Sequence, residues 1–240
     1  MGRRLVLLAF VAFAAAPAHA VGDEAGSAPK LTFEAEALSD YRFRGISLSG
    51  GEPAVQAEAL LEFDSGVWAS AWGSTLSGTD VELQLGLGYS HDIFRRLNLE
   101  VSINYYAYPS DGASNYFEGA AALSYPFGAL TPKLGIEYAP AQDHLRDESG
   151  AKRDNLYAFL ALELALPKTP VTLDGQVGYE TGVFDTRAAG GKWDWRIGAK
   201  ARTRWLDFGL AYVDSNGRLR SGSGRNLAGE QLVASVGKSF

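Results

Sequence analysis

The sequence contains no cysteine and only three histidines. The absence of cysteine excludes a disulfide framework, thiol chemistry and a lipid anchor attached to an amino-terminal cysteine. No long apolar run follows residue 20, so no membrane-spanning helix is expected there. Any residence of the remaining chain in a membrane must therefore be as a β-barrel, whose strands satisfy each other's backbone hydrogen bonds.

The amino-terminal residues have the three parts of a secretory signal peptide. Two arginines supply positive charge, Leu5 to Ala16 form an apolar stretch, and Ala18-His19-Ala20 places small residues around a cleavage point. About a dozen apolar residues are too few to cross a membrane as a helix, which takes roughly 20. We expect residues 1–20 to be a signal peptide and residues 21–30 to be a flexible lead-in.

Positive charge is also scarce. Removal of the two amino-terminal arginines leaves 20 of the 22 Lys and Arg residues against 28 Asp and Glu, so the net charge falls from −6 to −8. This balance argues against a nucleic-acid partner, which favours a basic surface.

What the chain does have is alternation. From Val81 to Ser90 every second residue is apolar, which gives a strand one apolar face and one polar face. A helical period of 3.6 residues would spread the same side chains around the whole helix. The apolar positions of this stretch are Val81, Leu83, Leu85, Leu87 and Tyr89.

The same pattern returns to the last residue and predicts an all-β chain. We expect a single antiparallel transmembrane β-barrel of about 12 strands over residues 31–240, with Leu31 to Ser47 as its first strand. Even-numbered connections are short and odd-numbered ones are mostly longer, as in barrels with short periplasmic turns and longer outer loops. The expected short turns are Asp64 to Gly66, His91 to Arg95, Pro126 to Ala129, Pro167 to Pro170 and Thr203 to Trp205.

Alternation alone does not say which face is outside, because soluble barrels such as lipocalins turn their apolar face inward. Here the polar face carries charges of both signs, which suit a water-filled lumen better than a dry core. Aromatic residues gather near the strand ends, as girdles at two membrane interfaces would. The candidate interface aromatics are Tyr89, Tyr105, Tyr125, Tyr138, Tyr179, Tyr212 and Phe240.

The carboxyl terminus supports the same orientation. A final Phe240 on a period-two strand resembles the carboxyl-terminal signal of outer-membrane barrels, which implies contact with the barrel-assembly machinery. Lys238 departs from the pattern because it shares the face of Phe240; near the interface its side chain can reach back to water.

Seven short segments of the chain form a recognisable set of motifs. They are Ser39-Asp40-Tyr41-Arg42-Phe43-Arg44-Gly45-Ile46-Ser47, Pro53-Ala54-Val55-Gln56, Gly66-Val67-Trp68-Ala69-Ser70-Ala71-Trp72, Tyr105-Tyr106-Ala107-Tyr108-Pro109, Asn115-Tyr116-Phe117-Glu118, Asp207-Phe208-Gly209-Leu210-Ala211-Tyr212 and Lys238-Ser239-Phe240. Through these residues the chain resembles, from about Leu31 to Phe240, the TorF family of proteobacterial porins. The resemblance implies an outer-membrane barrel with a pore in a Gram-negative bacterium, and it names no solute.

The charged residues of the polar face are candidates for a constriction that filters small hydrophilic solutes by charge during passive diffusion. Alternatively, the same charges pair and fill a narrow barrel. Arg42 and Arg44 either point at an anionic solute or pair with a neighbouring acid. The candidate lumen residues are Glu34, Glu36, Asp40, Arg42, Arg44, Glu58, Glu82, Glu100, Glu137, Glu163, Asp174, Arg196, Lys200 and Arg202.

Two other classes compete with a porin-like channel. A lipid-modifying enzyme needs a nucleophile beside a base, and His91 and His144 are placed in a turn and a loop, so we expect no catalytic residue. A non-conducting binding or adhesion barrel would use the loops Ala139 to Asp154 and Asp214 to Gly229. The first loop could hold calcium through carboxylates or simply be a solvated charged loop. We expect no cofactor or metal, and as partners outer-membrane lipid and a small hydrophilic solute.

Overall fold

The computed structural model of the chain describes residues 28–110, 114–147, 149–187 and 190–240. The expected signal peptide and most of the expected lead-in lie outside these residues. Within the described ranges, no helix combines the length and apolarity needed to cross a membrane.

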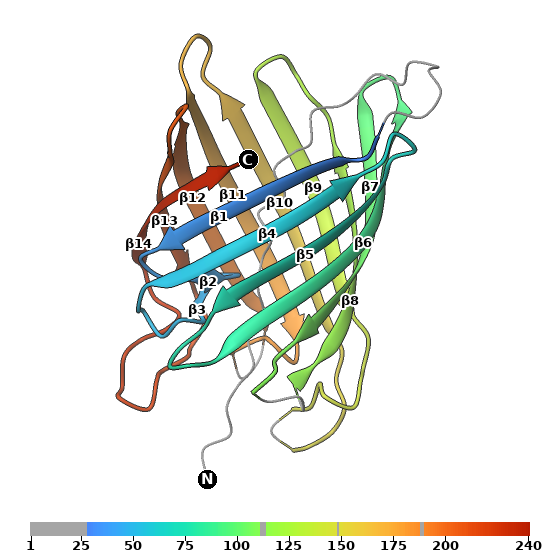
Figure 1. Cartoon of the computed structure of the whole chain (residues 1–240). Coiled ribbons are helices and arrows are strands. Elements are labelled where there is room, and N and C mark those ends of the chain that lie inside the picture. The colour runs from blue at the N-terminus through green and yellow to red at the C-terminus, as the bar shows by residue number, and fades with distance from the viewer. Residues whose placement is uncertain (1–27, 111–113, 148, 188–189) are drawn as a thin grey trace.

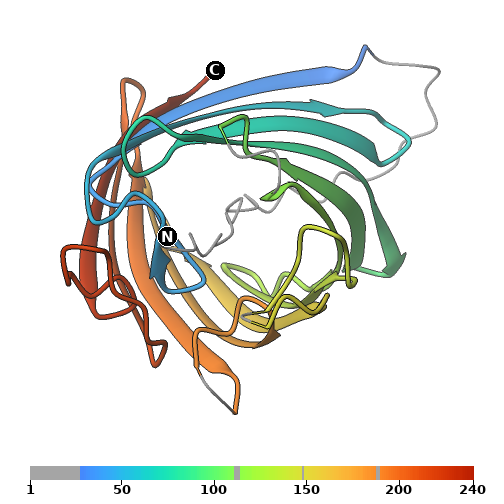
Figure 2. The same cartoon turned by 90° about the horizontal axis from the view of Figure 1, so that it is seen from below.

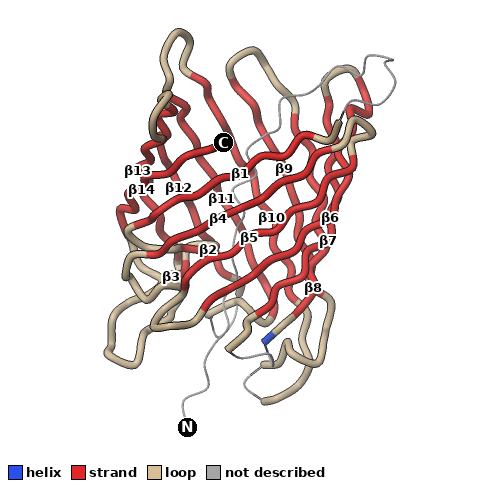
Figure 3. Tube along the Cα trace, viewed as in Figure 1, coloured by secondary structure: helices blue, strands red, loops and turns tan. Residues whose placement is uncertain are grey.

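The described residues form a closed 12-strand antiparallel barrel, so the predicted fold class is confirmed (Figures 1 and 3). Consecutive barrel strands pair with each other, and β1 closes the ring by pairing with both β4 and β14. The barrel strands are β1 (Lys30–Leu38), β4 (Ala54–Glu62), β5 (Val67–Thr75), β6 (Val81–Phe94), β7 (Leu97–Ala107), β8 (Tyr116–Ser124), β9 (Leu130–Ala139), β10 (Asn155–Ala165), β11 (Val171–Gly182), β12 (Lys192–Arg202), β13 (Asp207–Ser215) and β14 (Gln231–Ser239).

The connections give the barrel two different ends. Brief turns gather at what we call the short-turn end, drawn at the top of Figure 1, and all the connections longer than five residues lie at the opposite, long-loop end. The connections of the short-turn end are 63–66, 95–96, 125–129, 166–170 and 203–206. Those of the long-loop end are 39–53, 76–80, 108–115, 140–154, 183–191 and 216–230.

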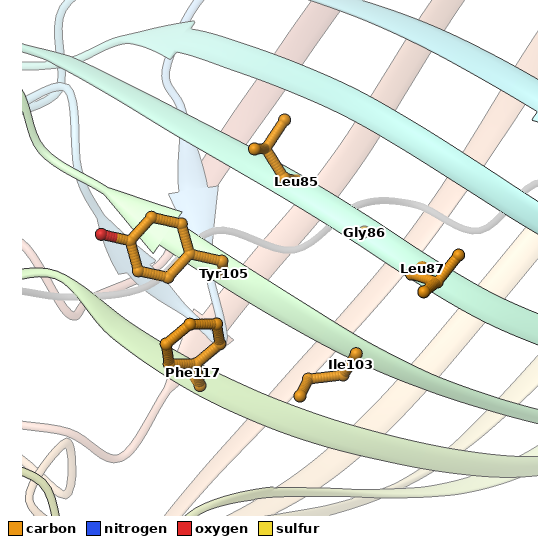
Figure 4. Close-up of a pocket in the computed structure, with 6 residues that line it drawn as sticks. All are labelled: Leu85, Gly86, Leu87, Ile103, Tyr105 and Phe117. Atoms are coloured by element: carbon orange, nitrogen blue, oxygen red, sulfur yellow. The ribbon is translucent and has the colours of Figure 1, made fainter.

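The outward face of the wall is apolar and the inward face is polar. On β6, Leu85 is 58% exposed while its neighbour Gln84 is 3% exposed, and this alternation continues along the strand. Figure 4 shows Leu85, Ile103 and Phe117 projecting from β6, β7 and β8. These side chains line a shallow hollow of ≈ 150 Å³ on the outer surface. Such a surface is costly in water and favourable in lipid.

The seven aromatic residues expected at the interfaces all project outward near the strand ends. Several pack against an aromatic neighbour, such as Tyr105 against Phe117 with ring centres 4.6 Å apart. One group lies toward the short-turn end: Tyr89, Tyr125 and Phe240. The other lies toward the long-loop end: Tyr105, Tyr138, Tyr179 and Tyr212.

Two expected boundaries are wrong. The first strand ends at Leu38 rather than Ser47, and residues 39–53, which we call the inserted segment, turn into the barrel. A tight hairpin preserves the side-chain alternation of a strand, so periodicity could not separate the two. The connection expected at His91 to Arg95 shrinks to residues 95–96, because β6 continues to Phe94 through an irregularity in its pairing.

The inserted segment is itself a small hairpin. Its strands β2 (Arg42–Phe43) and β3 (Ile46–Ser47) are joined by Arg44 and Gly45, both with positive φ, at 43° and 81°. Positive φ at both central residues characterises the type I′ turn of two-residue hairpins. An arginine there is unusual, since a Cβ disfavours this conformation and side chains such as Asn or Gly are preferred.

Candidate functional site

The candidate site is the lumen, and its two halves differ. At the long-loop end the inserted segment lies inside the ring of strands, as Figure 2 shows from that end. Side chains around it are almost completely buried. Toward the short-turn end lies what we call the open zone, where inward charged side chains keep contact with solvent; Lys200, for example, is 33% exposed.

Arg44, at the tip of the inserted segment, is the centre of the filled half. Its side chain is 0% exposed and its two terminal nitrogens donate to three carboxylates. The Arg44 Nη1–Glu180 Oε1 distance is 2.6 Å and the Nη2–Glu118 Oε1 distance is 2.9 Å, and Nη2 also bonds Glu137. We call Glu118, Glu137 and Glu180, from β8, β9 and β11, the carboxylate cage.

Aromatic rings and a lysine complete the surroundings of Arg44. The guanidinium carbon lies 4.5 Å from the ring centre of Phe43 and 4.3 Å from that of Tyr157, within the range of cation–π attraction. Lys192 Nζ lies 2.6 Å from Glu180 Oε2 and donates to the backbone oxygen of Arg44 at 2.6 Å. A charge buried this completely is tolerated only because it is paired and hydrogen-bonded.

Gly45 is what allows the tip to reach the wall. A Cβ added there would lie 2.6 Å from the Cβ of Ser215 and 2.9 Å from that of Asp194, which is closer than side-chain carbons approach. Glycine therefore serves twice at this point, in the positive φ of the turn and in the close approach to β12 and β13.

Aromatic packing anchors the remainder of the inserted segment. Tyr41 and Phe43 are buried in a cluster with residues of the wall, and the ring centre of Tyr41 lies 5.7 Å from that of Trp72. The Tyr41 hydroxyl donates to Glu82 at 3.2 Å, and the Tyr108 hydroxyl donates to the same carboxylate at 2.7 Å. The wall residues of the cluster are Ala54, Trp72, Tyr106, Tyr116 and Ala139, and loop residues Tyr108, Leu145 and Phe184 join them.

Asp40 and Arg42 hold the base of the inserted segment together. The Asp40 carboxylate accepts from Arg42 Nε at 2.7 Å and from the hydroxyl of Ser47 at 2.6 Å. Arg42 also donates to the backbone oxygens of Gly45, at 3.3 Å, and Gly229. Of the two interpretations of Arg42 and Arg44, pairing with acids of the protein is therefore the one that the geometry favours.

The open zone holds most of the remaining candidates on the inward face. Lys200 Nζ lies 3.4 Å from Glu34 and 4.0 Å from Glu36, and Arg196 pairs with Asp174. Glu34 and Glu58 stand opposite each other on β1 and β4. Glu100 pairs with Lys133 at 3.3 Å. Arg202, 58% exposed, lies at the rim and contacts Asp207, whereas Glu163 lies on β10 beside Thr131 and Asp174.

The structure therefore divides the candidate list. Glu82, Glu137, Asp40, Arg42 and Arg44 meet in the filled half, and the others lie in or at the rim of the open zone. Glu118, Glu180 and Lys192, which complete the surroundings of Arg44, are absent from the candidates. Their inward positions follow from alternation, but the sequence has no signal that acids from β8, β9 and β11 converge on one arginine.

The two histidines within the described residues lie away from both halves of the lumen. His91 projects outward from β6 with its ring stacked on Tyr89 at 5.8 Å, and His144 is exposed in the 140–154 loop. In the described ranges no group of three or more His, Cys, Asp or Glu side chains is arranged to hold a metal ion. In the loop considered for calcium, Asp143 bonds Lys152 at 2.5 Å and Asp147 bonds Ser149 at 2.5 Å.

Comparison with known proteins gives one family and several solved structures. A family model described as "Bacterial protein of unknown function (Gcw_chp)" matches residues 22–240. No curated protein matches the chain. The fold is similar to that of the NanC porin, with a TM-score of 0.63 and 15% identity over 88% of this chain and 99% of that one. The KdgM porin gives 0.60 and 8% over 87% and 98%.

A further similar structure is a channel of known source. The COG4313 outer membrane channel from Pseudomonas putida F1 gives a TM-score of 0.50 with 14% identity, over 91% of this chain and 97% of that chain. At these identities the likeness is one of fold, and the fold is that of porin-like barrels.

Proposed function

The chain belongs to the Gcw_chp family of bacterial proteins of unknown function, and from that premise we propose that it is a porin-like outer-membrane channel. In this proposal small hydrophilic solutes diffuse passively through a charged lumen that the inserted segment narrows at the long-loop end. We assign no catalytic residue and no cofactor to it. The resemblance to TorF-family porins and the similarity in fold to the NanC and KdgM porins support the same class.

One observation carries this proposal: charged side chains that remain in contact with water line the inside of a barrel whose outside is apolar. Asp174 and Arg196 are 27% and 46% exposed on the inward face, while Leu85 is 58% exposed on the outward face. A soluble barrel has the opposite arrangement, because its apolar side chains fill the interior. Ionised groups around a water-filled path are the usual construction of a diffusion channel.

The carboxyl-terminal strand supports residence in an outer membrane. Lys238, on the apolar face, donates from Nζ to the backbone oxygen of Arg204 at 2.8 Å in a short turn, so its charge leaves the apolar band. Phe240 is 76% exposed and exchanges backbone hydrogen bonds with Phe33, at 3.2 and 2.8 Å. We propose that this strand is the contact for barrel assembly, after export and cleavage of residues 1–20 in a Gram-negative bacterium.

A second candidate function has an observation in its favour. Because the inserted segment fills the long-loop end, the alternative is a non-conducting barrel that acts through the outer loops 140–154 and 216–230, which are as long as the inserted segment. Conductance separates the two functions. The inserted segment can be removed with little change to the wall, because Leu38 and Ala54 are direct partners in β1 and β4.

The test is planar-bilayer recording of refolded protein with and without the inserted segment. Replacing residues 40–53 by one glycine leaves Ser39 and that glycine as a two-residue turn, a connection suited to antiparallel neighbours. We expect discrete conductance steps from the wild type, and steps at least about twofold larger from the variant because the path is wider. A control variant lacking Gly222 and Ser223, at the exposed tip of another loop, should conduct like the wild type.

The outcomes are distinct. Absence of conductance from both refolded proteins would rule out the channel function. A silent wild type with a conducting variant would favour the plugged barrel of the second candidate. Equal steps from wild type and variant would mean that the inserted segment does not narrow the path.

A further inference from the structure

The carboxylate cage has the composition of a binding site for a cation. Glu118, Glu180 and Glu137 come from three strands of the wall, so their backbones belong to the barrel and not to the inserted segment. With Asp194 they supply four acids, which face only two bases, Arg44 and Lys192. The excess of negative charge in a water-poor region attracts cations strongly.

The occupant of the cage shows which cation fits. Arg44 makes all its side-chain bonds there through Nη1 and Nη2, and its Nε has no hydrogen-bond partner among the described residues. The contacts are thus made by the part of the side chain that any guanidinium compound shares. The aromatic rings of Phe43 and Tyr157 pack against the guanidinium. A planar guanidinium group suits this geometry better than a tetrahedral ammonium group.

A second feature points into the same place. Asp194 is 4% exposed, its Oδ1 accepts from the Tyr157 hydroxyl at 3.1 Å, and its Oδ2 has no partner in the described part of the chain. A buried carboxylate oxygen without a donor is costly, so it marks a place where a further donor would be stabilised. Arg44 itself is held at a φ of 43°, a conformation that other residues would adopt more easily.

We propose that the carboxylate cage, with Tyr157, is the recognition site of this channel for solutes that carry a guanidinium group, and that Arg44 occupies it as an internal competitor. The proposal rests on the proposed channel function and names its solute class. When the inserted segment moves out of the cage, the guanidinium group of such a solute takes the place of the Arg44 guanidinium. Anionic solutes find no unpaired base in the cage, because Arg44 and Lys192 are both bound by carboxylates there.

The binding test removes Arg44 and supplies the missing group. Arg44→Gly suits the positive φ and leaves the three carboxylates without their cation. We expect this variant in detergent to melt at a lower temperature than the wild type. Guanidinium chloride at about 10 mM, well below denaturing concentrations, should recover most of the loss because a ligand that binds only the folded state stabilises it. Equal sodium or tetramethylammonium chloride should recover little.

A matched variant tests whether the recovery comes from the cage. Arg44→Gly combined with Glu118→Gln should respond more weakly to guanidinium, by about tenfold in the concentration needed for half recovery, since one of three carboxylates is lost. Recovery by all three salts alike, or equal recovery in the double variant, would overturn the proposal because it would show a general effect of ions.

The functional arm compares two solutes of nearly equal shape through the wild type in liposomes. L-arginine and L-citrulline differ only in having a guanidinium or a neutral urea group, so we expect faster flux of arginine and saturation at millimolar concentration. Equal or faster flux of citrulline would overturn the recognition. This arm decides the question even if Arg44→Gly does not fold.

The two arms separate the two proposals. If guanidinium restores the melting temperature of Arg44→Gly but neither solute crosses the membrane, the channel function is ruled out and a binding site remains. Flux without preference and without recovery leaves a channel and removes the cage as its recognition site.

Discussion

Glycine residues on the inward face decide how far aromatic rings enter the lumen. The ring of Trp68 on β5 lies against Gly88, its partner on β6, and a Cβ added to Gly88 would lie 2.3 Å from Cζ2 of that ring. Phe159 likewise lies against Gly135, where an added Cβ would lie 2.3 Å from Cζ of the ring. Large side chains are thus kept along the wall because the neighbouring strand has no side chain at that point.

Gly88→Ala should therefore displace Trp68. Forcing an added methyl into a packed site costs typically about 1–3 kcal/mol, and we expect the urea midpoint of unfolding in detergent micelles to fall accordingly. Gly119→Ala is the matched control, because the nearest atom to its added Cβ is 3.9 Å away. Equal midpoints for the two variants would mean that the ring does not depend on the glycine.

At this scale the sequence predicts the direction of a side chain but not its partners. Alternation places Glu137 and Glu82 on the inward face, where the structure has them. It cannot predict that Glu137 meets Arg44, because that contact depends on curvature that closes the wall and on a turn at residues 44–45. The aromatics of the inward face, such as Trp72 and Tyr157, were hidden among equally apolar neighbours.

At the scale of elements, strands were predicted well and the inserted segment was not. Strands such as β6 carry a period of two over many residues, which no other element reproduces. The inserted segment has the same period for only a few residues on each side of Gly45. Its turn is signalled by one glycine and by Asp40, Ser47 and Ser49, whose mutual hydrogen bonds fold the base of the hairpin.

The 140–154 loop is also held by a local carboxylate. Asp147 accepts from the Ser149 hydroxyl at 2.5 Å and from the backbone nitrogens of Ser149 and Ala151, at 2.9 and 3.1 Å. The bond from the Ser149 hydroxyl is the main reason why the pKa of Asp147 lies below its ordinary value of 3.8. A folded pKa below the unfolded one means that the stabilisation is present above the unfolded value and is lost as pH falls.

We therefore expect this turn to loosen below about pH 4 while the barrel stays intact. Amide hydrogen exchange, corrected for its intrinsic pH dependence, should show faster exchange at Ser149 and Ala151 at pH 3 than at pH 7, relative to amides of β10. In the Asp147→Ala variant, the amides of Ser149 and Ala151 should exchange quickly at both pH values. Unchanged protection of Ala151 at pH 3 would mean that the carboxylate does not hold the turn.

At the scale of the whole molecule, the closed barrel and the direction of its faces follow from properties that are repeated in every strand. One misplaced boundary does not alter these properties. The fold can therefore be predicted even though the expected end of the first strand is wrong. The filling of the lumen is different in kind. The lumen is filled by the inserted segment, whose position depends on long-range contacts such as the hydrogen bond from Lys192 to Arg44. Such contacts leave no pattern in the sequence.

The charge of the open zone leads to a prediction for the complete channel. Acids outnumber bases on the inward wall there, since Glu34, Glu36, Glu58, Glu100, Glu163 and Asp174 face Lys133, Arg196 and Lys200. Such a path favours cations. In a KCl gradient, the reversal potential of the wild type should therefore shift toward the equilibrium potential of potassium. The shift should be larger near 0.1 M salt, where the screening length is about 10 Å, than near 1 M, where it is about 3 Å.

Neutralising two acids should weaken that preference. Glu34→Gln with Glu58→Gln removes two facing acids from the wall, so we expect the ratio of potassium to chloride permeability to fall by about twofold or more at low salt. Glu52→Gln is the control, since Glu52 is 68% exposed and pairs with Arg225 of the 216–230 connection at the long-loop end, away from the open zone. An anion-selective wild type, or an equal change in the control, would mean that these carboxylates do not line the path, and the open zone would then not be the route that ions take.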